Sequence, residues 1–149
     1  MIINLPEKYK KKKIHVGLPD KEIINKNIFE KNNLSKKIIF IYGGSQGSEN
    51  LINNFLSIVK SIDNKELDKL KFLIQCPKKL DVLLKKSLKK LKVDFEIKSF
   101  FSNIDNILSK TDIAITRAGA GTINDLIKYK VPSIIFPLPH SIYNHQYYN

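Results

Sequence analysis

Short apolar runs recur along the chain, and they are mostly continuous rather than alternating with polar residues. They are rich in β-branched residues and are bounded by turn-forming residues, a pattern typical of strands that are covered on both faces. The pattern predicts strands at Lys13–Val16, Lys37–Tyr42, Lys71–Cys76, Val93–Ser99, Asp112–Thr116 and Ser133–Phe136.

Segments with apolar residues at helical spacing lie between these strands. Two of them have clear apolar faces, formed by Leu51, Phe55, Ile58 and Val59 in the first and by Leu80, Leu83, Leu84, Leu88 and Leu91 in the second. Shorter helices are expected over Ile104–Ser109, over Thr122–Lys128 and from about Asn144 onward.

This alternation of strands and helices predicts an α/β fold with a doubly wound, mainly parallel sheet and right-handed crossovers. The 149 residues suffice for one domain with a real core. We expect residues 1–20 to form a connector with an edge strand, and residues 21–149 to form a ligand-binding domain. Because the last predicted helix begins just before Asn149, this domain is expected to be truncated at its C-terminal end.

The charge of the chain is strongly basic. It has 26 basic and 14 acidic residues, and Arg117 is the only arginine among them. Phosphate and base-edge readers favour the guanidinium fork, and the lysines lack interleaved aromatic residues, so we expect no specific nucleic-acid partner. Two interpretations of the lysines stay open: a solvated surface, or attraction to an anionic membrane face at about 1 kcal/mol per nearby lysine.

The remaining composition indicates a cytoplasmic protein. No run of eighteen apolar residues and no signal-peptide pattern is present. The single Cys76 excludes an internal disulfide and lies in an apolar run, which favours a buried structural thiol over a nucleophile.

A glycine-rich segment, residues 43–48, directly follows the strand Lys37–Tyr42 and opens a helix. Glycines let the backbone approach a ligand closely, and a helix N-terminus presents unpaired N–H groups to a phosphate. The segment is neither GxGxxG nor a P-loop. A plain strand-to-helix turn with Ser48 as N-cap is the alternative.

A second glycine segment, residues 117–122, follows the strand Asp112–Thr116 and contains Arg117. Asp125 is expected in the first turn of the following helix, where two interpretations apply. An acid there is a favourable partner for the helix dipole, or it accepts hydrogen bonds from a ribose diol, as acids do near dinucleotide sites.

A third motif, residues 137–140 (PLPH), follows the last predicted strand, and residues 144–146 (NHQ) come shortly after. The prolines set a rigid loop. His140 and His145 are five residues apart, which does not match zinc ligands on one helical face, so we expect no metal and no cofactor. All three motifs follow strands, at the end where open parallel sheets bind ligands.

At these motifs the sequence resembles a known family. Residues 41–47 (IYGGSQG), 116–122 (TRAGAGT), 137–140 and 144–146 resemble the C-terminal domain of the MurG family. The resemblance implies a Rossmann-like half of a GT-B glycosyltransferase, an inverting enzyme that moves GlcNAc from UDP-GlcNAc to lipid I, forming lipid II in peptidoglycan synthesis. It also implies a location at the inner face of the cell membrane.

The resemblance implies roles for matching positions. Ser45, Gln46 and their neighbours would contact the diphosphate or ribose, and Phe101 would hold the uracil. The turn formed by Ala120, Gly121 and Thr122 would meet the phosphates through backbone N–H groups. Asp125 would bind the ribose, and Gln146 would lie near the sugar hydroxyls. Further candidates for ligand contact are Lys21, Gly44, Arg117, His140 and Asn144.

Several departures from the family pattern matter. The family's GNPVR segment is here Gly17-Leu18-Pro19-Asp20-Lys21, and Asp125 stands where the family has Glu, which shortens the reach by one methylene. The N-terminal acceptor domain of the family, which carries the proposed base, has no counterpart in this sequence, so we expect this chain alone to be inactive. The alternatives are the donor domain of another UDP-sugar transferase of the GT-B type, or an inactive nucleotide-sugar-binding remnant.

Overall fold

The computed structural model describes residues 36–43, 49–138 and 145–148. Its strands are β1 (Lys37–Tyr42), β2 (Leu70–Gln75), β3 (Asp94–Lys98), β4 (Ile113–Thr116) and β5 (Ser133–Ile135). Its helices are α1 (Glu49–Ser61), α2 (Asn64–Leu67), α3 (Lys78–Lys90), α4 (Ile104–Leu108), α5 (Ala120–Lys128) and α6 (His145–Tyr148).

The predicted strands within the described residues are confirmed, with ends that differ by at most one residue. The sequence did not predict α2, a short helix that begins after Asp63, whose side chain accepts a hydrogen bond from the Lys65 N–H at 2.9 Å. The start of α5 was also wrong by two residues, because the helix begins at Ala120 rather than Thr122. The predicted strand Lys13–Val16 lies outside the described residues.

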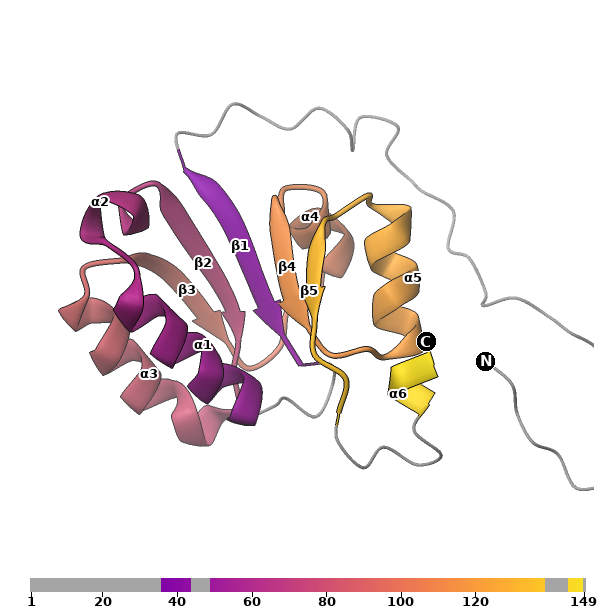
Figure 1. The fold of residues 1–149 in the computed structure, drawn as a ribbon, viewed down its shortest axis with the longest axis horizontal. Coiled ribbons are helices and arrows are strands. Elements are labelled where there is room, and N and C mark those ends of the chain that lie inside the picture. The colour runs from indigo at the N-terminus through magenta and orange to yellow at the C-terminus, as the bar shows by residue number, and fades with distance from the viewer. Residues whose placement is uncertain (1–35, 44–48, 139–144, 149) are drawn as a thin grey trace, which may run out of the picture.

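The strands form one sheet in the order β3-β2-β1-β4-β5, and every neighbouring pair is parallel. The chain winds outward from β1 to β3, then returns to the other side of β1 for β4 and β5 (Figure 1). The predicted doubly wound α/β fold is therefore confirmed. Strand order reverses between β1 and β4, and this topological switch point is where such sheets place their ligands.

Helices cover both faces of the sheet, and alternate residues of β1 serve two separate cores. Ile39 and Ile41 pack on the face that α1 and α3 cover, whereas Ile38, Phe40 and Tyr42 pack with α4 and α5 on the opposite face. Phe40 and Ile41 are completely buried. Burial on both faces explains why the β1 sequence is continuously apolar instead of alternating.

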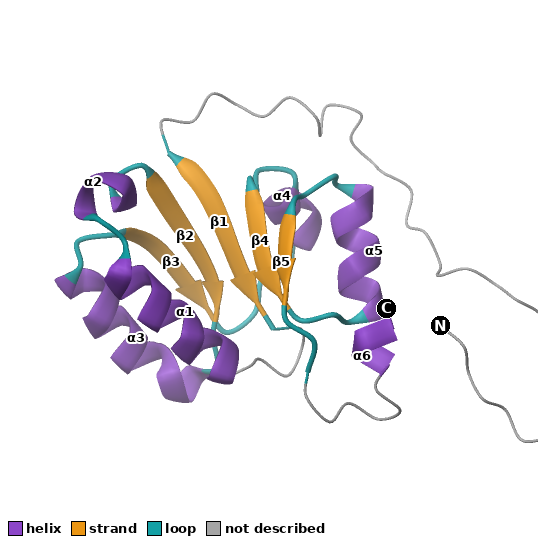
Figure 2. Cartoon of the chain, viewed as in Figure 1, coloured by secondary structure: helices purple, strands orange, loops and turns teal. Residues whose placement is uncertain are grey.

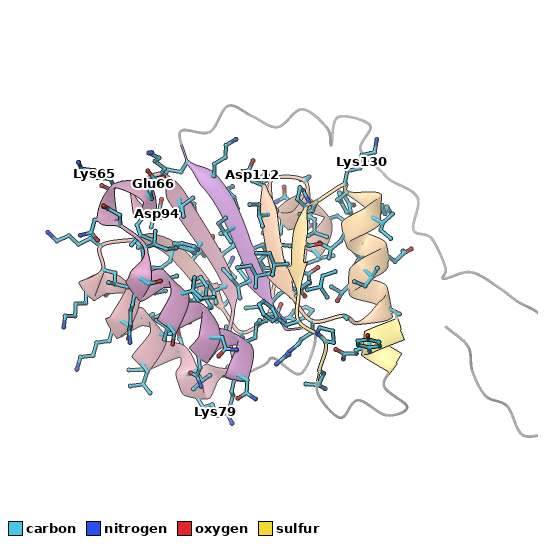
Figure 3. The ribbon with its side chains drawn as sticks, in the orientation of Figure 1. Lys65, Glu66, Lys79, Asp94, Asp112 and Lys130 are labelled. Atoms are coloured by element: carbon cyan, nitrogen blue, oxygen red, sulfur yellow. The ribbon has the colours of Figure 1, made fainter. Side chains whose placement is uncertain are left out.

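Ion pairs gather at the amino-terminal edge of the sheet, at the opposite end from the glycine segments. Asp112 accepts a hydrogen bond from the Ile38 N–H at 2.9 Å and pairs with Lys37 at 3.3 Å. Asp94 pairs with Lys36 at 3.4 Å on the same edge (Figure 3). These pairs hold strand ends together and leave the carboxyl edge to the glycine segments.

Candidate functional site

The carboxyl ends of β1 and β4 form the centre of the candidate site. Tyr42 and Thr116 are partners in register as the last residues of these strands. The strand tips and the start of α5 lie at the same edge of the sheet (Figure 2). The end of β1 and the second glycine segment after β4 therefore lie at the switch point, where open α/β folds place a ligand site.

Several predicted site residues fall outside the described residues, and no position is assigned to them. They are Lys21, Gly44, Ser45, Gln46, His140 and Asn144.

The first turn of α5 presents backbone N–H groups at the switch point. Gly119 is the N-cap, with an extended backbone (φ −69°, ψ 137°), and its carbonyl accepts the first helical hydrogen bond from Ile123 at 2.9 Å. The N–H groups of Ala120, Gly121 and Thr122 precede that bond and have no acceptor within the helix. Gly121 is exposed, and a Cβ added there would meet no atom within 4 Å. This geometry suits an anion such as a phosphate.

Asp125 lies in the second turn of α5, not in the first as the sequence suggested, because the helix starts two residues earlier. The helix dipole acts mainly within the first turn, so the dipole interpretation of this acid loses its basis. Asp125 shares a helical stripe with Thr122 and with the buried Leu126 and Tyr129, which pack towards the sheet. Asp125 is partly buried, and its charge acts on the Tyr42 hydroxyl at the end of β1.

The negative charge of Asp125 affects the pKa values of two tyrosines, Tyr42 and Tyr129. Burial raises the pKa of the Tyr42 hydroxyl, and the negative charge of Asp125 raises it further, while the nearby Thr116 hydroxyl lowers it slightly. Burial also raises the pKa of Tyr129, with added contributions from Asp105 and Asp125. Among the described residues no hydrogen-bond partner with good geometry reaches the buried Tyr42 hydroxyl.

Phe101 lies near the site, but its ring belongs to the core. The side chain is only 4% exposed and packs edge-on against Phe40, with ring centroids 5.4 Å apart. The Phe101 N–H donates to Gln75 Oε1 at 3.4 Å. Phe100, which was not a predicted site residue, is 62% exposed just beyond the carboxyl end of β3. Because Phe100 and Phe101 are identical neighbours, the sequence does not indicate which of the two rings is exposed.

Arg117 and Gln146 both direct their side chains onto the segment after β5. Arg117 Nη1 donates to the carbonyl oxygens of Phe136 and Pro137, at 3.1 Å each. Gln146 Oε1 accepts from the Leu138 N–H at 2.9 Å. Arg117 is only 9% exposed, and this burial lowers the pKa of its guanidinium. The structure thus brings the second and third motifs into one hydrogen-bonded unit.

Other reactive groups of the described residues do not form a second site. Burial raises the pKa of the Cys76 thiol to about 11, which agrees with a structural thiol. Within the described ranges, no three His, Cys, Asp or Glu side chains are grouped so as to hold a metal ion. No helix there is both long and apolar enough to cross a membrane.

Comparison with known proteins agrees with this geometry. The model of the glycosyltransferase family 28 C-terminal domain matches residues 38–149. Curated relatives from Rickettsia bellii (34% identical, 98% of this chain) and Rickettsia canadensis (36% identical, 99%) are both named UDP-N-acetylglucosamine--N-acetylmuramyl-(pentapeptide) pyrophosphoryl-undecaprenol N-acetylglucosamine transferase. A relative from Aquifex aeolicus with the same name is 34% identical over 91% of this chain.

The chain spans 42%, 43% and 40% of the lengths of these three relatives, respectively. Among solved structures, Acinetobacter baumannii MurG superposes with a TM-score of 0.67 at 22% identity. That match covers 81% of this chain and 34% of the solved chain, and it shows a shared fold. The match to the family model over most of the sequence shows that the chain belongs to the glycosyltransferase family 28 C-terminal domain family.

Proposed function

We propose that this chain binds UDP-N-acetylglucosamine and provides the donor-binding half of a transferase that moves GlcNAc to lipid I, forming lipid II. The observation that carries the proposal is the open first turn of α5 at the topological switch point. The relatives support the choice of donor, because UDP-N-acetylglucosamine is part of their name.

In this proposal the diphosphate binds at the first turn of α5. The N–H groups of Ala120, Gly121 and Thr122 donate to phosphate oxygens, and the absence of a side chain at Gly121 lets the ligand approach the backbone. Ser45 and Gln46, which follow β1, are proposed to contact the same part of the donor. Gly44 is proposed to contact it as well, and all three residues lie outside the described residues.

The nucleoside is proposed to lie between α5 and the end of β3. Asp125 accepts hydrogen bonds from the ribose hydroxyls, a role that its place in the second helical turn supports. The backbone of Phe101 faces the uracil, while its buried ring fixes that backbone. The exposed ring of Phe100 offers an apolar surface for the base. Gln146 lies beside the sugar in this arrangement.

The chemistry proposed for the complete enzyme is an inverting displacement. A base takes the proton of the acceptor 4-hydroxyl, the oxygen forms a bond to the anomeric carbon, and the bond from that carbon to the UDP oxygen breaks. Negative charge then develops on the leaving UDP. Backbone donors fixed at the start of α5 stabilise this charge more strongly as it grows. Neither a metal nor a cofactor is part of the proposal.

Calorimetry on the folded chain tests the donor. We expect binding of UDP-N-acetylglucosamine and UDP, and at least tenfold weaker binding of ADP-glucose, because Asp125 and the Phe100–Phe101 segment are proposed to read the uridine. Equal affinity for both nucleotide sugars, or no binding by a folded sample, would overturn the proposal. Equal affinity for UDP-glucose and UDP-N-acetylglucosamine would instead favour another UDP-sugar transferase.

We also propose contact with the anionic inner face of the cell membrane, through the outward face of α3. This helix contains six lysines and one acid, Asp81, which pairs with Lys85 at 2.7 Å. Val82 and Leu83 are 75% and 65% exposed among these lysines. Exposed apolar residues within a basic helix face are typical of binding at a membrane surface.

Vesicle sedimentation tests this contact. Lys86→Glu together with Lys89→Glu should abolish most binding to phosphatidylglycerol vesicles, since each lysine contributes about 1 kcal/mol there. Lys65→Glu with Lys110→Glu makes the same charge change on other elements and serves as the control. If both double variants lose vesicle binding equally, the binding depends on the net charge of the chain and not on the face of α3.

A further inference from the structure

The backbone pairing of β4 with β5 reaches Phe136, and side chains bind the segment that follows. The Phe136 N–H donates to the Thr116 carbonyl at 2.8 Å, and the next N–H that could face β4 belongs to Leu138, because alternate residues of a parallel strand donate to the same neighbour. Arg117 Nη1 donates to the carbonyls of Phe136 and Pro137. The arginine thus extends the contact between the two strands beyond their last backbone hydrogen bond.

A second side chain binds the same segment. The Leu138 N–H, the next backbone donor along the chain, is taken by Gln146 Oε1 of α6 at 2.9 Å. Backbone groups of three successive residues, from Phe136 to Leu138, are therefore each held by Arg117 or by Gln146. The residue that follows Arg117 leads directly to Gly119, the N-cap of α5.

The Arg117 guanidinium is suited to holding this segment, and it donates to backbone carbonyls of the protein. It is nearly buried, and one of its nitrogens serves two carbonyls at good distances. Its planar fork of donors stays charged even where burial lowers its pKa. A lysine ammonium on a shorter side chain lacks this fork.

We infer that Arg117 is a positioning residue and not a phosphate ligand: it locks the segment Phe136–Leu138 to the entrance of α5, and Gln146 locks the same segment to α6. The two motifs that the sequence presents separately then form one preformed wall beside the first turn of α5. The consequence for the ligand rests on the proposed function, because it assumes that a diphosphate binds at that turn.

The test compares Arg117→Lys, which keeps the charge, with Arg117→Met, which removes it. Amide hydrogen exchange measures directly whether the segment Phe136–Leu138 is held in place. In both variants, and in Gln146→Ala, we expect the Leu138 amide to exchange at least tenfold faster, while the Ile74 amide in β2 keeps its protection. Calorimetry should show a loss of UDP affinity of about tenfold that is similar in the Lys and Met variants, with little change for uridine. Lys110→Met controls for the loss of one positive charge.

The opposite pattern identifies a phosphate ligand. If Arg117→Lys retains wild-type Leu138 exchange and UDP affinity while Arg117→Met loses affinity, the inference is overturned. The same holds if Gln146→Ala leaves the Leu138 amide fully protected. Loss of Ile74 protection identifies a variant that opens globally, and Gln146→Ala then carries the test. If the wild-type chain does not bind UDP, the proposed function is overturned. The amide exchange rates would still show whether Arg117 and Gln146 hold the segment Phe136–Leu138 in place.

Discussion

Tyr42 and Thr116 stand opposite each other as the last residues of the two central strands, and both are buried beneath α5. The next helix after β1 is α1, which covers one face of the sheet, and the next helix after β4 is α5, which covers the other. Tyr42 stacks on Phe40 with ring centroids 4.3 Å apart, which fixes the end of β1. The strand ends below the candidate site are therefore part of the core, and we propose that the ligand-facing groups come from the segments that follow these strands.

Tyr42→Phe should leave the folded chain as stable as the wild type or stabilise it by up to about 1 kcal/mol. The reason is that a buried hydroxyl without a partner costs roughly 1–3 kcal/mol, and phenylalanine keeps the stacked ring. Urea unfolding of both proteins measures the difference. A loss above about 1 kcal/mol would show that Thr116 or another group does bond this hydroxyl.

Gly121→Ala should change stability and ligand binding in opposite directions. Alanine is favoured over glycine in a helix by up to about 1 kcal/mol, and the added methyl meets no protein atom. The same methyl would obstruct a phosphate at the first turn of α5, so we expect a higher melting temperature and about tenfold weaker UDP binding.

The control for this glycine variant is Asn54→Ala, an exposed position of α1 where a somewhat smaller gain in helix propensity lies away from the site. It should stabilise the chain and leave UDP affinity unchanged. Wild-type UDP affinity in Gly121→Ala would argue that the phosphates bind elsewhere.

Asp125→Ala should weaken both UDP and uridine binding by roughly 1–3 kcal/mol, the range for lost hydrogen bonds to a charged group. Inorganic pyrophosphate, which has no ribose, should bind equally well to the variant and the wild type. Isothermal calorimetry with the three ligands separates these effects. Asp68→Ala, at an exposed acid beside α2, is the matched control for charge. An unchanged uridine affinity would mean that Asp125 does not bind the ribose.

Cys76 should resist thiol reagents in the native chain at pH 8. Burial raises its pKa to about 11, so the reactive thiolate is on the order of a hundredfold rarer than for an ordinary thiol with a pKa of about 8.5. Labelling with a disulfide reagent in buffer and in urea measures this contrast. Native and unfolded rates that agree at pH 8 would contradict the burial.

The same shift has a consequence for alkaline stability. The folded state keeps the Cys76 proton up to about pH 11, whereas an unfolded thiol loses it near pH 8.5. Between these values the unfolded state binds fewer protons, so the free energy of unfolding falls as pH rises. This part of the decline should disappear in Cys76→Ala.

The alternation of elements was predictable because its signal is local. The continuous apolar run from Lys37 to Tyr42 indicated a strand buried on both faces, and β1 occupies the centre of the sheet. The helix α2 was missed since its four residues are too few to show a period. The first turn of α5 was missed because Ala120 and Gly121 carry no apolar or capping signal of their own.

Side-chain direction was not predictable, because it depends on neighbours that are distant in sequence. Phe100 and Phe101 look alike along the chain, yet only the second ring finds Phe40 beside it. Arg117 looked like a candidate ligand until the carbonyls of Phe136 and Pro137, some twenty residues later, took its hydrogen bonds.

The sequence by itself determined the strands of the sheet and the longer helices between them, the place of the glycine segments after strands, and the family, because periodicity and short motifs are local properties of the sequence. The tertiary structure decided which strand ends meet at the switch point, on which helical turn Asp125 lies, and what Arg117 and Gln146 hold. Those relations depend on β4 returning beside β1, a contact between residues more than seventy positions apart. Only the packed sheet brings such residues together, since hydrogen bonds between its strands join segments that have no local signal for one another.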